Sequence, residues 1–416
     1  MKNIFTSQMV RLAWKNIWRN KVRSGVILSA IAIGLFAGTF MLAFLNGWII
    51  GTVNSDIETQ YSHIQIHDTA FLVNYDINAC FLRKDVENNI CRDDIKGVPT
   101  KTAFRLCLTG MLASPYNVAG VTAKGVWEDE EKQVTTVWEQ IPDSLGAFLP
   151  EDAKMPIVIS SKIAEKLKVK LKSKIVFTFQ DVHGDMQGIA FRVCGIYKTT
   201  NAMFDESSVF IRYSDVFDYT GLPEDAVHEA AIRVSDLETC KTALPQLKNM
   251  FPDMTVQDWT ELNPAIAIIL TYTDFMAIIM MGIFLLALSF GIINTMLMAI
   301  LERTRELGML GAIGMSKKKI FNMIMLETVF LTLLGGIVGI VLGVALIVPL
   351  QKTGIDMSFY MQDQFEDFGF SSFVYPILDV KMLVQTIVLV IFAGILSAIY
   401  PARKALKLKP LEAIRE

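Results

Sequence analysis

The residues with the clearest potential for chemistry lie in one short segment, residues 302–316, where charged side chains are followed by three glycines. Charged side chains cost about 2.5 to 3.5 kcal/mol each at the centre of a bilayer for most residue types, so this segment must lie outside the hydrocarbon. Long apolar runs flank it on both sides. We therefore interpret the segment as a short helix pair that can pass a force to two membrane helices.

Signatures of catalysis are missing from the chain. It contains no G-x-x-x-x-G-K-[ST] phosphate loop, no H-E-x-x-H zinc site and no G-x-S-x-G nucleophile elbow. His63 and His67 occupy alternate positions of a predicted strand, but no carboxylate or thiol at suitable spacing completes a metal site. We expect a non-catalytic protein with no directly bound cofactor or metal, and no nucleic-acid partner.

Four apolar runs are long enough to hold the charged segment at a membrane. Apolar residues make up 52% of the chain and the mean hydropathy is +0.41, while charged residues are only 19%, below the roughly 25% of soluble domains. The runs cover residues 25–53, 275–301, 328–350 and 382–400. Each has about the 20 residues needed to cross a hydrocarbon core of roughly 30 Å, so we predict four transmembrane helices.

The distribution of basic residues predicts the orientation. Residues 1–24 hold six basic residues and no acidic one, whereas residues 302–319 and the tail after Tyr400 hold five basic residues each. The 351–380 connection has one basic residue against five acidic ones. Because basic loops remain in the cytoplasm, we expect both termini and the charged segment to be cytoplasmic, and the long insertion after the first span to be outside.

Two of the predicted helices are longer than a bilayer requires. Nothing breaks a helix between residues 25 and 60, and about 36 residues at 1.5 Å each give roughly 54 Å. Pro264 is a plausible start for the second helix, which would reach about 57 Å by residue 301. We expect both helices to project beyond the bilayer as stalks.

Small residues repeat at helical spacing within the spans. Such spacing lets neighbouring helices approach closely, but glycine is also common in membrane helices without a packing role, so both interpretations stay open. The candidate packing residues are Gly34 and Gly38 in the first span, and Gly335, Gly339 and Gly343 in the third.

The insertion between the first two spans reads as an α+β domain. Strand patterns recur, with one helical stretch at residues 161–167, and a proline-rich, acidic stretch at 127–155 predicts a division into two lobes. The lysines at 168, 170, 172 and 174 predict a solvated strand face or a surface for anionic headgroups. The predicted strands are residues 61–66, 157–159, 168–179, 189–197 and 208–213.

All five cysteines lie in this insertion, so at least one is unpaired. A Cys80–Cys91 disulfide and free buried thiols both stay open. In the third span Glu327 is the carboxylate nearest the interior, and we expect it to pair with a basic residue.

These patterns give a linear organisation for the chain, which we predict to be an α-helical membrane protein with four transmembrane helices and an α+β extracytoplasmic domain between the first and second. The predicted parts are a cytoplasmic amphipathic helix (1–24), transmembrane helix 1 (25–53, with a stalk to about 60), the extracytoplasmic or periplasmic domain (61–262), the stalk and transmembrane helix 2 (264–301), the cytoplasmic coupling segment (302–319), transmembrane helix 3 (320–350), an extracytoplasmic loop (351–380), transmembrane helix 4 (381–400) and a cytoplasmic tail (401–416).

Several of these stretches resemble a known family. The permease core shared by the MacB, LolC/LolE and FtsX proteins is similar to ERTRELGMLGAIGMS, to residues 321–327 and to the following glycine-containing span, and the family's ending is similar to YPARKALKLKPLEAIRE. The external domain of the LolC/LolE and MacB branch is similar to IVISSKIAEKLKVKLKSKIVFTF and to FRVCGIYKTTNAMFDESSVFIRYSDV. The resemblance covers nearly the whole chain apart from about residues 70–150. Gly311 departs from it, because the family usually has a basic residue there, and so does the 172–174 turn.

The resemblance implies a permease subunit of an ABC transporter that works by mechanotransmission. A separate cytoplasmic ATPase dimer, which binds ATP and Mg, would dock on the charged segment and drive the stalks. Leu307, Met309, Leu310 and Ile313 would fill the ATPase groove. The implied coupling residues are Glu302, Arg303, Arg305, Glu306, Leu307, Gly308, Met309, Leu310, Gly311, Ala312, Ile313 and Gly314.

Three functions are compatible with this resemblance. We favour extraction of lipoproteins, or other lipidated cargo, from the outer leaflet of a bacterial inner membrane, because HIQIHD after the first stalk and the GIY run look more like LolC/LolE than MacB. The alternatives are MacB-like efflux of drugs, peptides or toxins, and FtsX-like activation of a cell-wall hydrolase. The expected partners are the ATPase, a second permease subunit that is a copy or a sister protein, the hydrophobic cargo and membrane lipid.

Overall fold

The computed structural model describes residues 2–19, 21–92, 100–357 and 373–406. The chain divides into a helical unit, Met1–Ile49, Leu270–Ile355 and Val374–Glu416, and an α+β unit, Ile50–Ile269 and Asp356–Phe373. The insertion therefore folds as one compact unit. The α+β unit contains most of the residues between the first and second long helices.

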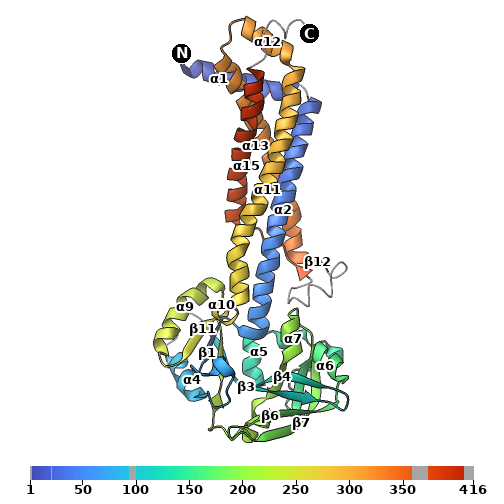
Figure 1. Ribbon diagram of the computed structural model, residues 1–416, viewed down its shortest axis with the longest axis vertical. Helices are drawn as coiled ribbons and strands as arrows, with labels where there is room; N and C mark the ends of the chain where they lie inside the picture. Colours follow the sequence, from blue (N-terminus) through green and yellow to red (C-terminus); the bar gives the residue numbers. More distant parts are fainter. Residues whose placement is uncertain (1, 20, 93–99, 358–372, 407–416) are drawn as a thin grey trace. The chain divides into compact units, whose positions relative to one another are not determined.

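Figure 1 shows the long helices of the chain, and in the sequence they are nearly continuous runs of apolar residues. Four are long and apolar enough to cross a membrane, and they occupy Ser24–Tyr61, Pro264–Glu302, Lys317–Thr353 and Val380–Ala405. This confirms the prediction of four apolar helices. The helix bounds are α1 Lys2–Arg19, α2 Lys21–Asp56, α11 Pro264–Glu302, α12 Thr304–Ala312, α13 Lys317–Thr353 and α15 Val380–Ala405, and a π-helical turn, Ile57–Tyr61, continues α2.

The amphipathic first helix is shorter than predicted, because α1 ends at Arg19 and Lys21 already begins α2. Its apolar side packs on α13, where the ring of Trp14 meets that of Phe330 edge-on with centroids 5.8 Å apart. Ile17 of α1 is fully buried in the core of the helical unit. Burial of this apolar stripe, rather than intrinsic propensity, is what stabilises a short amphipathic helix.

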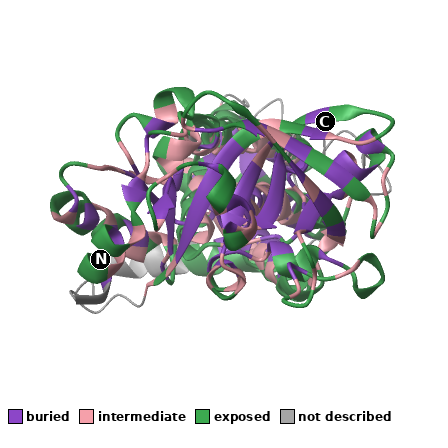
Figure 2. Ribbon diagram, turned by 90° about the horizontal axis from the view of Figure 1, so that it is seen from below, coloured by how far each residue is buried: buried purple, intermediate pink, exposed green. Residues whose placement is uncertain are grey.

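A nine-stranded sheet forms the centre of the α+β unit, in the order β11-β1-β10-β3-β4-β8-β5-β7-β6. An additional pairing of β3 with β6 closes six of these strands into a barrel, and β10, β1 and β11 continue from the first half of β3. The strands are mostly buried (Figure 2). Their bounds are β1 Ile64–His67, β3 Lys101–Ala113, β4 Val118–Val126, β5 Pro156–Ser160, β6 Lys174–Gln180, β7 Met186–Tyr197, β8 Ser208–Arg212, β10 Glu229–Arg233 and β11 Thr255–Asp258.

Helices and short turns cover the sheet and confirm the predicted α+β class. Ser160 caps the predicted helix α6 by accepting the N–H of Ile163 at 3.1 Å. Two strands, β2 and β9, pair separately from the main sheet. Further elements are β2 Phe81–Leu82, β9 Ala226–Val227, α3 Phe71–Asn74, α4 Arg83–Arg92, α5 Glu128–Val134, α6 Ser161–Leu167, α7 Ala202–Ser207, α8 Tyr213–Val216, α9 Leu237–Met250 and α10 Trp259–Leu262, and the short strands β12 Ile355–Asp356 and β13 Phe373–Val374 pair with each other.

Two predictions about this domain are wrong. The lysine ladder, the predicted row of lysines at 168, 170, 172 and 174, does not lie on one strand. Lys168 and Lys172 have positive φ angles of 52° and 67°, and the strand begins only at Lys174. Residues 127–155 do not separate two lobes either. Val137 and Phe148 from this stretch are buried in the same apolar cluster as Phe210 of β8, so the stretch is part of one core.

The cysteines do not cross-link the described part of this unit. Cys80, Cys107, Cys194 and Cys240 are free thiols, and the side chain of Cys91 lies outside the described residues. Burial raises the pKa of the Cys194 thiol to about 11, so it is protonated at neutral pH.

Candidate functional site

The charged segment folds as one helix rather than the predicted pair. Glu302 ends α11, Arg303 forms the turn, and α12 runs over Thr304–Ala312. Gly314 then adopts φ +96°, a left-handed conformation that a side chain would strain, and α13 starts after Ser316. The segment is therefore a single nine-residue helix between two turns, held at both ends by long helices of the same unit.

Arg303 holds this helix to its neighbours. Its Nη1 donates to both carboxylate oxygens of Glu327 on α13, at 3.0 and 3.2 Å, and its Nη2 donates to the backbone oxygen of Asn16 on α1 at 3.2 Å. The side chains of Arg303 and Glu327 are only 13% and 5% exposed. The expected basic partner of Glu327 is therefore Arg303, and this arginine faces the interior instead of a partner protein.

The other three charged residues of the segment remain at the surface. Glu306 pairs with Arg19 of α1, and both side chains are about half exposed. Glu302 and Arg305 are exposed. These three residues can contact another protein without leaving a buried charge unpaired.

The apolar residues of α12 divide between two faces. Leu307 is buried and Leu310 packs against the same core cluster, which also contains Ile17 and Ile320. Leu307 is therefore not free to enter a groove of another protein, contrary to the prediction.

The opposite face of α12 is exposed. Met309 is 46% exposed and Ile313 is 84% exposed. Together with Arg305 and Ala312, which are also exposed, these residues follow the three- and four-residue spacing of one helix side. We call Arg305, Met309 and Ala312, together with Ile313 in the turn that follows, the exposed face of α12. Gly308 is buried and Gly314 is exposed, whereas for Gly311 the structure describes only its place in the helix.

The predicted packing glycines lie at helix contacts, some of which are too close for a side chain and some of which are at ordinary van der Waals distance. A Cβ at Gly335 would lie 2.8 Å from Ile31 Cβ, and one at Gly339 would lie 2.6 Å from the backbone oxygen of Ala32, so α13 approaches α2 closely at both positions. A Cβ at Gly34 would lie 3.3 Å from a Leu288 side-chain atom of α11. The corresponding distances are ordinary at Gly38, 3.8 Å to Phe284, and at Gly343, 3.4 Å to Thr39.

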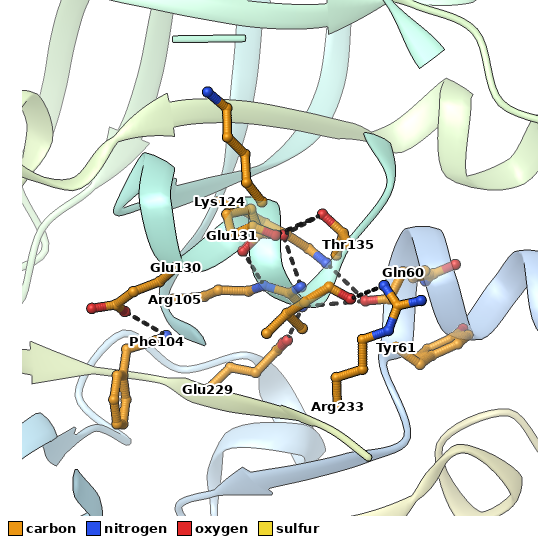
Figure 3. A network of polar contacts seen from close by, with 12 residues as sticks. Gln60, Tyr61, Phe104, Arg105, Lys124, Glu130, Glu131, Thr135, Glu229 and Arg233 are labelled. Carbon is orange, nitrogen blue, oxygen red and sulfur yellow. Dashed lines mark hydrogen bonds and ion pairs between the residues drawn. The ribbon is translucent and has the colours of Figure 1, made fainter. Parts of the chain in front are cut away.

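A buried charge network in the α+β unit was missed by the sequence analysis. Arg105 on β3 is fully buried, and its Nε and Nη2 donate to the two carboxylate oxygens of Glu131 on α5 at 2.9 and 2.8 Å (Figure 3). Its Nη1 donates to Glu229 on β10 and to the backbone oxygen of Gln60, the latter at 3.2 Å. The sequence feature that indicates this network is the presence of Arg105 and Lys124 inside otherwise apolar strand sequences.

No cluster of three or more histidine, cysteine or acidic residues that could hold a metal occurs among the residues that the structure describes. His67, one of the two histidines considered as metal ligands from the sequence, makes other contacts. The ring nitrogens of His67 contact the backbone oxygen of His228 at 3.0 Å and Oε1 of Gln65 at 2.9 Å. Burial lowers the pKa of His228, whose Nδ1 accepts the N–H of Cys107 at 3.1 Å and therefore carries no proton.

Four helices long and apolar enough to cross a membrane, an inserted α+β unit and a charged helix between the second and third of them make up the architecture of a multi-pass membrane protein. A model of the FtsX-like permease C-terminal family matches residues 278–410, which include α12, α13 and α15. This part of the chain therefore carries an FtsX-like permease domain, and the chain as a whole is similar to ABC transporter permeases such as LolC and MacB.

Two relatives are similar over all or nearly all of the chain. The uncharacterized ABC transporter permease MJ1507 of Methanocaldococcus jannaschii is 23% identical over 100% of this chain and 99% of its own length. The lipoprotein-releasing system transmembrane protein LolC of Neisseria meningitidis serogroup B is 22% identical over 94% of this chain and 93% of its own length. The solved periplasmic region of MacB from Actinobacillus actinomycetemcomitans is 12% identical, with a TM-score of 0.34, over 52% of this chain and 98% of that structure.

Proposed function

We propose that this permease extracts lipoproteins, or other lipidated cargo, from the outer leaflet of the bacterial inner membrane, using ATP hydrolysis by a separate cytoplasmic ATPase. The observation that carries this proposal is the similarity to LolC, which extends over 94% of this chain and 93% of the relative. It includes the α+β unit as well as the membrane helices. The charged helix α12 would face the cytoplasm and the α+β unit the opposite side.

The lengths of two helices support transmission of force. At 1.5 Å per residue, the 36 residues of α2 and the 39 residues of α11 extend about 54 and 58 Å. A hydrocarbon core is only about 30 Å thick, so part of each helix must lie outside it. Both helices continue from the helical unit into the chain of the α+β unit. A shift at the α12 end of α11 can therefore reach the other side of the membrane without a pore.

The contacts of Arg303 support α12 as the entry point of that force. Because Arg303 binds Glu327 on α13 and the backbone of α1, a push on α12 is shared by several helices rather than absorbed by a loose loop. The exposed face of α12 would then meet the ATPase through Met309 and Ile313. Arg305 would add a polar contact at the edge.

A substitution on this face tests the ATPase contact. We predict that Ile313→Asp lowers co-purification of the co-encoded ATPase by about 10-fold or more, because it places a charge on the exposed apolar residue that directly follows α12. The measurement is the ratio of ATPase to permease after affinity purification of the permease. Met203→Asp is the matched control, since Met203 is 71% exposed on α7 of the α+β unit. Normal co-purification with Ile313→Asp would refute the contact.

The cargo is tested by reconstitution. The permease and its co-encoded ATPase are placed in lipid discs loaded with candidate lipoproteins, and lipoprotein release is measured with and without ATP. ATP-dependent release supports the proposal. Export of a drug or peptide without lipoprotein release would instead support MacB-like efflux, and stimulation of a cell-wall hydrolase without transport would support the FtsX-like role.

A further inference from the structure

One face of the sheet in the α+β unit is polar, although most of it is buried. The register places His67 opposite Glu229, Glu229 opposite Arg105, and Cys107 opposite Lys124. Paired residues point to the same side of a sheet, and so do residues two positions apart along a strand. The polar face runs from β11 to β8 through Gln257, Gln65, His67, Glu229, Arg105, Cys107, Lys124, Thr109, Thr122 and Ser208.

A cavity of about 650 Å³ lies over this face. That volume is in the range of pockets that bind small molecules, roughly 300 to 1,000 Å³. Phe71, Leu72 and Tyr75 line it with aromatic and apolar surface, whereas Lys124 and Glu229 bring opposite charges to it. All of the lining residues belong to the α+β unit. The cavity therefore combines an apolar wall with two charged groups.

Lys124 is incompletely satisfied at this site. Lys124 is only 7% exposed. Among the described residues, its Nζ donates a single hydrogen bond, to the backbone oxygen of Gln60 at 3.4 Å. The ring of Phe204 lies 5.7 Å from the same nitrogen. An ammonium group has three donors, and a buried charge without partners is costly. Consistent with this cost, burial lowers the pKa of Lys124.

Glu229 has spare accepting capacity on the same face. Its Oε1 accepts from Arg105 and from Gln65 Nε2, the latter at 3.0 Å. Its Oε2 contacts only the thiol of Cys107, at 3.8 Å, within the described part of the chain. No ion pair within 4.0 Å joins Lys124 to Glu229 among these residues. A ligand between them can satisfy both groups.

We propose that this cavity binds a small zwitterion, an amino acid or a short peptide, whose carboxylate pairs with Lys124 and whose ammonium pairs with Glu229 Oε2. The two buried cations, Arg105 and Lys124, already balance the two buried carboxylates of Glu131 and Glu229. A ligand of zero net charge preserves that balance, whereas a simple anion or cation leaves one buried charge in excess. Phe71 and Tyr75 then offer a surface for an apolar side chain.

Binding to the full-length protein in lipid discs tests the proposal by isothermal titration calorimetry. The probes are glycyl-L-tyrosine, its C-terminal amide, which lacks the carboxylate, and its N-acetyl derivative, which lacks the ammonium. We expect saturable binding of the dipeptide and at least about 10-fold weaker binding of both derivatives. Equal binding of the three probes, or no binding of the dipeptide or of any of the standard amino acids at about 10 mM, would overturn the proposal.

A variant identifies the cavity as the site. Lys124→Met keeps the length of the side chain and removes its charge, so we expect it to bind the acid and the amide with equal, weak affinity. Lys174→Met is the control, since Lys174 is exposed at the start of β6. Unchanged preference for the acid in a folded Lys124→Met variant would refute the assignment. If that variant fails to fold, the comparison of the three probes on the unaltered protein still decides the outcome. Neither experiment depends on the ATPase or on the cargo.

Discussion

Arg105 shows at the scale of one residue how the α+β unit tolerates buried charge. All of its hydrogen bonds in Figure 3 go to carboxylates or to a backbone oxygen, so each of its three desolvated nitrogens has at least one partner. Removing the guanidinium leaves two buried carboxylates without their cation. That arrangement is far more costly than losing an exposed ion pair.

We predict that Arg105→Met destabilises the α+β unit by about 3 to 5 kcal/mol, because Glu131 and Glu229 stay buried. The measurement is urea unfolding of the purified protein, followed by tryptophan fluorescence. Arg192→Met is the control, since Arg192 is exposed on β7, and we expect it to change the stability by less than about 0.5 kcal/mol. Equal effects of the two variants would show that the network contributes nothing.

Because of His63, we predict that the folded protein loses stability in mild acid. Burial, and then the nearby positive charge of Arg233, lower the pKa of His63 from 6.5 to about 4, while Asp236 acts in the opposite direction. As the pH falls, His63 therefore binds a proton at a higher pH in the unfolded chain than in the folded protein. The contribution of His63 is complete above pH 6.5 and is lost as the pH falls toward 4.

We expect His63 to account for about 2 kcal/mol of the stability lost between pH 7.5 and 5. Unfolding curves of His63→Gln should fall less steeply with decreasing pH than those of the unaltered protein. His183→Gln serves as the control because His183 is exposed in a turn. Parallel pH profiles for the unaltered protein and His63→Gln would contradict the prediction.

At the scale of elements, one close helix contact joins α2 and α13. A methyl group at Gly339 would lie 2.6 Å from the backbone oxygen of Ala32 and 2.9 Å from Leu35 Cβ, so the two helices would have to separate. In the spans, close approach replaces the hydrophobic effect as the source of helix association. The glycines of α13 therefore set the distance between these helices.

We predict that Gly339→Ala lowers the thermal stability of the helical unit in detergent, with a cost of about 1 to 3 kcal/mol from overpacking. Gly282→Ala in α11 is a matched control, because nothing lies within 4 Å of the position of its Cβ. Alanine also has the better helix propensity, so the control should be neutral or slightly stabilising. A neutral result for Gly339→Ala would mean that the helices are not in tight contact.

At the scale of the whole molecule, the proposed function requires α12 and the α+β unit to face opposite sides of the membrane. Single cysteines at Ser207 and Ser316, in a chain whose native cysteines are replaced, report on the two sides, and both positions are exposed. We expect a membrane-impermeant maleimide to label Ser207→Cys in intact spheroplasts. Ser316→Cys should react only after permeabilisation. Labelling of both positions in intact spheroplasts would contradict the proposed topology.

The sequence alone predicted the four apolar helices and the α+β class, because both depend on local patterns. A bilayer requires about 20 apolar residues per span, and a strand or helix shows its period within ten residues. It also predicted a basic partner for Glu327. It did not predict the length of α1, the single helix at α12 or the break in the lysine ladder, since such boundaries depend on turns with positive φ and on packing.

Only the tertiary structure decided which charged residues face inward. In the sequence, nothing distinguishes Arg303 from the charged residues beside it. Its partners, Glu327 and Asn16, are 24 and 287 positions away. Arg105 likewise meets Glu229 across 124 positions. No local pattern encodes such separations. The sequence determined which segments are apolar enough to cross a membrane, and the pairing of distant charges determined which surfaces remain free to bind a partner.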